Sequence, residues 1–192
     1  MDPMETRTRI VATADELYNA RGIQAVGMDE LRSAAGVSLK KLYQEFPSKS
    51  SIVMAVLERR HRSWAEGLEA AVRRVPGPRE RLLAIFDYLA QWFCEDSFRG
   101  CGFINSFAEV GAVDPEVARY AREHKASFQE YVGALADEAG APAFLAPQLS
   151  ILAEGAQTTA AIAGTADAAQ QARRAAEVLI DAALGARAGR AA

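Results

Sequence analysis

The segment from Met28 to Lys49 constrains the fold of this chain more than any other part of the sequence. It predicts a short helix that ends at Gly36, because glycine adopts the left-handed conformation of a helix terminus without steric cost. Ser38 is a favourable N-cap for a second helix over residues 39–46, and Pro47 then stops that helix. Two short helices joined by so tight a turn are typical of a helix-turn-helix, whose second helix enters the DNA major groove.

Apolar residues recur at helical spacing along the rest of the chain, and no stretch alternates with a period of two. The sequence therefore predicts an all-α fold of about nine helices and no sheet. Besides the two helices of the opening segment, the predicted helices cover residues 5–21, 49–75, 79–95, 101–110, 114–139, 143–163 and 167–184.

Composition excludes several classes of protein. Half of the residues are hydrophobic, which is enough for a sizeable core, but no apolar run approaches the length of a membrane span. The polar N-terminus does not resemble a secretory signal, so we expect a cytoplasmic protein with no membrane partner. Cys94 and Cys101 are the only cysteines, and with two histidines they build neither a disulfide framework nor a zinc cluster.

We also find no paired histidines, nucleophile elbow or phosphate loop. The sequence thus predicts no enzyme, no cofactor and no metal site. The net charge of −3 gives no general attraction to DNA, so a DNA-binding function depends on where the charges lie.

The N-terminal third of the chain resembles the TetR family of bacterial transcriptional regulators. The order and spacing of RIVATADELYNARGIQAVGMDEL, AAGVS, LY and FPSK carry the resemblance. It implies a three-helix helix-turn-helix DNA-binding domain over residues 1–48. It further implies a divergent helical domain over 49–192 that binds a small ligand and dimerises through its last two helices.

The resemblance implies that one face of the second short helix contacts DNA, and that Tyr43 and Lys49 touch phosphates. Lys49 lies in the first turn of a helix, where the helix dipole favours an anion. Lys40 and Lys41 stand where the family often has Gly-Thr, and Glu45 stands where histidine is frequent, so base preference does not transfer. The predicted DNA-binding residues are Gly27, Met28, Arg32, Ser38, Leu39, Lys40, Lys41, Tyr43, Gln44 and Lys49.

Aromatic side chains along the predicted C-terminal helices can line an apolar cavity, with a few polar groups among them. Plain core packing is the alternative for each aromatic, and a satisfied core histidine is the alternative for His124. The predicted ligand-binding residues are Trp64, Phe86, Trp92, Phe103, Asn105, Phe107, His124, Phe128, Tyr131 and Gln157.

Two stripes of small and apolar residues mark the last two helices. One consists of Leu145, Leu149, Leu152, Ala156 and Ala160, and the other of Ala172, Ala176, Leu179 and Ala183. They are either ordinary core faces or a self-complementary dimer interface. Similarly, Cys94 and Cys101 either form a redox pair or are buried, reduced thiols.

The sequence predicts a homodimeric transcriptional regulator, most often a repressor in this family. We expect it to bind a palindromic double-stranded operator and to leave it when a small apolar or amphipathic effector binds. Two alternatives stay open. One is an all-helical small-molecule carrier or enzyme with a vestigial helix-turn-helix, and the other is a regulator without a ligand.

Overall fold

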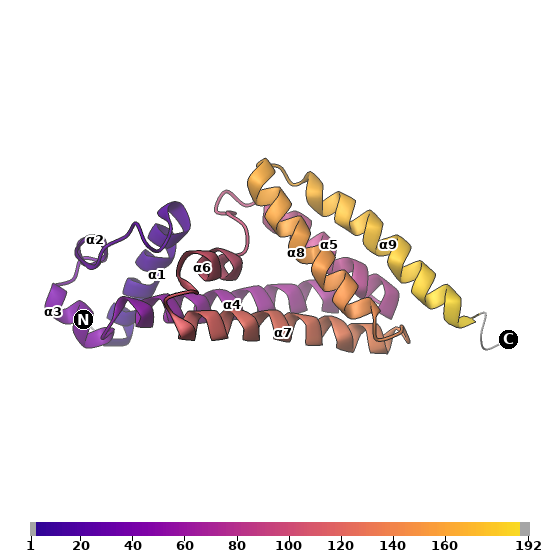
Figure 1. The fold of residues 1–192 in the computed structure, drawn as a ribbon, viewed down its shortest axis with the longest axis horizontal. Coiled ribbons are helices and arrows are strands. Elements are labelled where there is room, and N and C mark those ends of the chain that lie inside the picture. Colours follow the sequence, from indigo (N-terminus) through magenta and orange to yellow (C-terminus); the bar gives the residue numbers. More distant parts are fainter. Residues whose placement is uncertain (1–2, 189–192) are drawn as a thin grey trace. The chain divides into compact units, whose positions relative to one another are not determined.

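The computed structural model describes residues 3–188, which form nine helices and no strand (Figure 1). The predicted all-α class is confirmed. None of these helices combines the length and apolar character needed to cross a membrane. The helices are α1 (Pro3–Arg21), α2 (Met28–Ala34), α3 (Leu39–Glu45), α4 (Lys49–Arg73), α5 (Pro78–Phe93), α6 (Gly102–Val110), α7 (Pro115–Glu138), α8 (Leu145–Ala163) and α9 (Asp167–Ala188).

Local signals in the sequence set several helix ends. Ser38 caps α3, since its Oγ accepts a hydrogen bond from the Lys41 backbone N–H at 3.1 Å. Asp114 caps α7 in the same way and accepts from the N–H groups of Glu116 and Val117, both at 3.2 Å. The helix α3 ends at Glu45, and Phe46, the last residue of the predicted range 39–46, is its C-cap. Phe46 is extended (φ −139°, ψ 108°), because a residue that precedes proline is disfavoured in the helical region.

The chain folds into two compact units. The N-terminal unit comprises residues up to Ser63 together with Gly102–Glu123, and the C-terminal unit comprises Trp64–Cys101 together with the residues from His124 onward. The long helices α4 and α7 contribute residues to both units. A functional boundary between residues 48 and 49 stays a prediction. The compact units divide the chain at other positions, after residues 63, 101 and 123.

The core of the N-terminal unit joins α1 to the two short helices. Ile10, Ala14, Leu42, Phe46 and Ile52 are completely buried. The turn between α2 and α3 follows the pattern expected at Gly36, which has φ +64°. The Val37 N–H bonds the Arg32 carbonyl at 2.9 Å across this turn, as in a Schellman motif.

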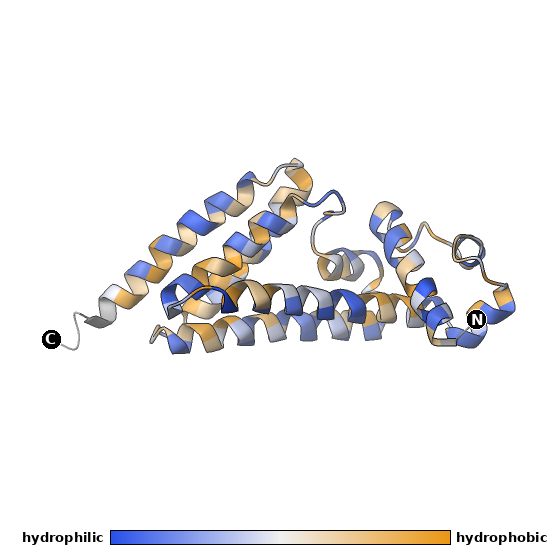
Figure 2. Cartoon of the chain, turned by 180° about the vertical axis from the view of Figure 1, so that it is seen from behind, coloured by the Kyte–Doolittle hydropathy of each residue, from blue (hydrophilic) through white to orange (hydrophobic). Residues whose placement is uncertain are grey.

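The C-terminal unit is built from α5, α8 and α9, with the C-terminal part of α4 and of α7. Polar and apolar residues recur along α9 at helical spacing (Figure 2). All nine stripe residues named above belong to this hydrophobic core, Leu152 and Leu179 as partly buried neighbours and the other seven as buried members. Of the two alternatives for the stripes, the structure therefore supports core faces of the protomer and excludes a dimer interface made of these residues.

Ion pairs tie α5 to α9 at the edge of this core. Arg79 donates to Asp181 at 2.7 Å and to Glu177 at 3.3 Å, while Arg173 donates to Asp87 at 2.6 Å. The helix α9 runs to Ala188, four residues beyond the predicted end at 184.

Gly36 offers a test of the turn that orients α3. We expect Gly36→Ala to lower the free energy of unfolding by about 1 kcal/mol, because an L side chain at positive φ is strained. A Cβ at this position would meet nothing within 4 Å, so the loss is conformational. Urea denaturation of the purified protein measures it.

Gly27→Ala is the matched control. Gly27 has φ −85°, and a Cβ there also meets nothing within 4 Å, so its stability should stay within about 0.5 kcal/mol of the parent. Equal effects of the two substitutions would contradict the role given to the left-handed turn.

Candidate nucleic-acid interface and ligand site

The helix α3 presents one face to the core and the other to solvent. Leu42 and Phe46 are fully buried, and they fix the rotation of the helix about its axis. Consequently Lys40, Tyr43 and Gln44 lie on the exposed face. Leu39 and Ser38 are exposed at the N-terminal end of the same helix.

Two arginines of α1 hold the ends of the short helices, a role that the sequence alone did not suggest. Arg7 donates from Nη1 to the Glu45 carbonyl at 2.7 Å, and its guanidinium lies 4.0 Å from the centre of the Phe46 ring. Arg9 donates from Nε to the Ala35 carbonyl at 3.0 Å. A cation is favourable at such positions because the C-terminal carbonyls of a helix carry partial negative charge. No local pattern predicts these bonds, because the carbonyl partners are 38 and 26 residues away in the chain.

The cationic side chains around α3 differ in how far they are neutralised. Lys41 pairs with Glu45 at 2.7 Å, and Arg32 pairs with Asp29 at 2.9 Å. Arg32, one of the predicted DNA-binding residues, is thus held by an acidic neighbour in the free protein. Lys40 makes no ion pair within the part of the chain that the structure describes, so it is the most available cation on this helix.

The remaining predicted DNA residues lie at helix starts. Gly27 precedes α2 in extended conformation with no side-chain cap, and Met28 is the first residue of that helix. Lys49 opens α4 and is partly buried, which lowers its pKa below the ordinary value, while the negative charge of Glu109 acts in the opposite direction. All ten predicted DNA residues belong to the N-terminal unit.

The predicted ligand residues do not belong to one compact unit. In the C-terminal unit Trp64 contacts the rings of His124 and Phe128, with centroid distances of 5.3 and 5.2 Å. His124, Phe128, Phe86 and Gln157 are buried there. Tyr131 and Trp92 are partly buried against the same core, and Trp92 packs edge-on against Phe98 at 5.1 Å.

The other three predicted ligand residues lie on α6 in the N-terminal unit. Phe103 is buried and packs against the rings of His61 and Tyr120. Asn105 and Phe107 are exposed on the same helix. A ligand site made of the whole predicted set stays a prediction.

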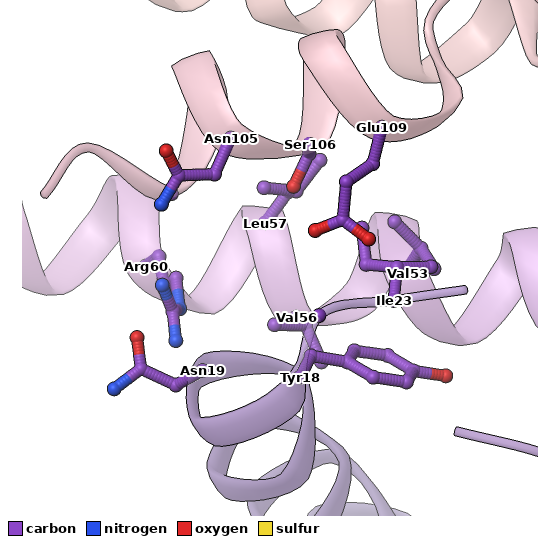
Figure 3. A pocket seen from close by; sticks show the side chains of 12 residues that line it. Tyr18, Asn19, Ile23, Val53, Val56, Leu57, Arg60, Asn105, Ser106 and Glu109 are labelled. Carbon is purple, nitrogen blue, oxygen red and sulfur yellow. The ribbon is translucent and has the colours of Figure 1, made fainter. Parts of the chain in front are cut away.

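A cavity of about 140 Å³ lies in the N-terminal unit between α1, α4 and α6 (Figure 3). Of the predicted ligand residues, Asn105 alone lines it. Its other polar lining includes Asn19, Arg60 and Glu109, which no local pattern distinguished from surface residues. Tyr18 also lines it, and the Tyr18 hydroxyl is buried without a hydrogen-bond partner among the described residues.

The two cysteines have different environments. Cys101 is buried, and Lys125 Nζ lies 3.4 Å from its sulfur while pairing with Glu154 at 3.3 Å. Cys94 is exposed because it caps the C-terminus of α5 at the surface. Both are free thiols, so the expectation of buried, reduced cysteines is wrong for Cys94, and a redox pair stays a prediction.

Tyr18 gives a prediction about alkaline stability. Burial raises the pKa of Tyr18 to about 12 from an ordinary value of 10.0. The unfolded chain therefore ionises first, and the stability that this hydroxyl contributes is complete below pH 10 and is lost as the pH rises toward 12. We expect Tyr18→Phe to remove about 2 kcal/mol of the fall in unfolding free energy between pH 8 and pH 11.5.

Urea denaturation at pH 8, 10 and 11.5 measures the difference. Tyr43→Phe is the matched control, because Tyr43 is exposed. A parallel pH dependence in the parent and in Tyr18→Phe would contradict the burial of this hydroxyl.

Comparison with known proteins gives a family match that covers the helix-turn-helix. Residues 10–56 match the family model described as bacterial regulatory proteins, tetR family. Over 114 residues the chain is 34% identical to the HTH-type transcriptional activator FasR of Mycolicibacterium smegmatis, covering 59% of this chain and 51% of FasR. Over 108 residues it is 31% identical to the HTH-type transcriptional repressor NemR of Escherichia coli, covering 55% of this chain and 54% of NemR. The matches thus span about half the length of these curated relatives.

The fold extends the likeness to most of the chain. A crystal structure of a TetR-family transcriptional regulator from Streptomyces coelicolor superimposes with a TM-score of 0.88. The superposition covers 94% of this chain and 97% of that one, at 24% sequence identity, and so shows a common fold. The chain therefore carries a TetR-family helix-turn-helix over residues 10–56, and its described residues have the fold of a TetR-family regulator.

Proposed function

We propose that this chain is a homodimeric transcriptional repressor that binds a palindromic DNA operator and releases it when a small effector binds. The exposed face of α3 carries this proposal. Leu42 and Phe46 lock the helix in place, and Lys40, Tyr43 and Gln44 project from its other side. No paired catalytic groups accompany this face, and the relatives are regulators of transcription.

The chemistry of that face suits DNA. A lysine pairs with the O6 and N7 acceptors of guanine, and a glutamine pairs with adenine in the major groove. We assign these two roles to Lys40 and Gln44. The Tyr43 hydroxyl and Lys49 are assigned to phosphates, which position the protein without reading sequence. Lys41 joins them only if DNA displaces its ion pair with Glu45.

The outer faces of α8 and α9 support a homodimer. Ile151 and Val178 are 73% and 68% exposed, and they lie on stripes of small and polar residues. A Cβ added at Gly155 or Gly185 meets nothing within 4 Å, so the protomer itself does not require glycine at either position. Small residues do, however, allow a second helix to approach closely. The exposed stripes are Gln148, Ile151, Gly155, Thr158 and Ile162 on α8, and Gln171, Ala175, Val178, Ala182 and Gly185 on α9.

A twofold dimer suits a palindromic operator, because its two α3 helices enter successive major grooves about 34–36 Å apart. The effector acts only if it binds the DNA-incompetent state more tightly than the competent one. FasR is an activator and NemR a repressor, so the sign of regulation needs its own measurement. A reporter gene behind the selected operator gives it, since repression lowers expression.

Selection of bound duplexes from random DNA tests the proposed DNA binding. We expect an enriched inverted repeat, because a twofold dimer presents two identical α3 helices. The salt concentration is held constant and given with each affinity, because phosphate contacts make affinity depend on salt. On that site Lys40→Ala, Tyr43→Ala and Lys49→Ala should each weaken binding by about 1 to 3 kcal/mol, measured by fluorescence anisotropy.

Arg122→Ala, which removes an exposed cation of α7, is the charge-matched control and should leave affinity unchanged. Loss of affinity in the control alone, or no enriched sequence, would contradict the assignment of α3. Turnover of a small molecule without DNA binding would point instead to a carrier or enzyme.

The dimer has a separate test. We expect the double substitution Ile151→Glu and Val178→Glu to weaken self-association at least about tenfold, because like charges then face each other across the interface. Sedimentation equilibrium measures the dissociation constant. Val113→Glu changes a residue that is 81% exposed in the N-terminal unit and should leave the dimer intact. An unchanged dimer in the double variant would exclude these stripes.

A further inference from the structure

The cavity between α1, α4 and α6 combines the features of a small-molecule binding site. Val53, Val56 and Leu57 of α4 supply an apolar wall, and all three are buried. Polar side chains reach the cavity from three helices: Asn19 from α1, Arg60 from α4, and Asn105 and Glu109 from α6 (Figure 3). Apolar walls with a few convergent polar groups are typical of small-molecule sites.

The charges around the cavity are already balanced. Arg60 donates from Nε to Asp15 Oδ1 at 2.5 Å and from Nη2 to the Asp15 carbonyl at 3.4 Å, so its guanidinium is fixed. Glu109 accepts a hydrogen bond from the Gln24 backbone N–H at 3.2 Å. With one cation and one anion lining it, the cavity favours an uncharged molecule that has a hydrogen-bond acceptor and a donor.

The size of the cavity limits the occupant. At about 140 Å³ it is close to the volume of roughly 150 Å³ that accommodates benzene in an engineered protein cavity. One six-membered aromatic ring with short polar substituents fits such a space. Gly102 also lines the cavity, and a Cβ there would come within 2.6 Å of Arg60 Nη1, so a side chain would displace this guanidinium.

One wall of the cavity also holds the segment that leads into the helix-turn-helix. The carbonyl of Glu109 accepts from Gln24 Nε2 at 2.5 Å, in addition to the bond from the Gln24 N–H to its carboxylate. Gln24 lies between α1 and α2. A molecule that donates a hydrogen bond to the Glu109 carboxylate shares this acceptor with the Gln24 N–H, and its binding is thereby linked to the position of α2 and α3.

From these contacts we propose that the cavity is an effector site for small, uncharged aromatic compounds, built into the N-terminal unit beside the helix-turn-helix. The effector's acceptor meets Arg60 and Asn105, and its donor meets Glu109. This inference rests on the proposed function, because an effector needs a DNA-bound state to change. None of the predicted ligand-binding aromatic side chains lines this cavity.

The first test is binding to the full-length protein without DNA. The probes are 4-hydroxybenzamide, benzamide and phenol. Their binding is measured in ¹⁵N–¹H correlation spectra of the protein. We expect saturable shifts of the Asn19, Gly22 and Asn105 amide signals with 4-hydroxybenzamide, at millimolar concentration for about ten heavy atoms. Benzamide and phenol, which each lack one polar group, should bind at least about threefold more weakly.

Asn105→Leu removes a polar lining group at an exposed position and should lower the affinity for 4-hydroxybenzamide at least about fivefold. Gln129→Leu, an exposed substitution on α7 in the C-terminal unit, is its control and should bind the probe as the parent does. No saturable shift at the cavity with any of the three probes up to about 10 mM would overturn the site.

The second test uses the selected operator. Saturating 4-hydroxybenzamide should weaken operator binding at least about threefold in the parent and less in Asn105→Leu. Binding at the cavity that leaves operator affinity unchanged would overturn the effector role. If no operator is found, the proposed function fails, and the spectra without DNA still decide whether the cavity binds the probe.

Discussion

The burial of Leu42 and Phe46 is the constraint on which the exposed face of α3 depends. These residues are four apart, so they lie on one side of α3, and both are completely buried. Their burial determines that Lys40, Tyr43 and Gln44 face outward. Pro47 ends the helix immediately afterwards, and α4 begins at Lys49. The face of α3 that we propose to contact DNA is therefore a consequence of core packing and one proline.

Several arginines of the N-terminal unit hold its helices in place through hydrogen bonds and an ion pair. Arg7 and Arg9 donate to carbonyls of Glu45 and Ala35, and Arg60 is held by Asp15. A net charge of −3 is compatible with DNA binding because Lys40 is exposed on α3 and makes no ion pair within the described part of the chain. The placement of each charge, and not the total, sets the local potential that DNA meets.

Small residues lie on two faces of α8 and α9, one buried and one exposed. Ala153, Ala160 and Ala176 are buried in the protomer. Ala175, Ala182 and Gly155 lie on exposed faces. In a sequence rich in alanine both faces have helical spacing, so periodicity does not distinguish the core from an exposed surface. Burial in the folded chain makes this distinction.

The sequence by itself determined the helices, the turn at Gly36, the caps at Ser38 and Asp114, and the class of the fold. These features depend on residues within one or two helical turns of each other, and local sterics and hydrogen bonds decide them. The tertiary structure alone decided the roles of Arg7 and Arg9, the inner faces of α8 and α9, and the cavity. Asn19, Arg60 and Asn105 are distant in the chain and line one cavity only when three helices pack, so no local pattern predicts that they lie together.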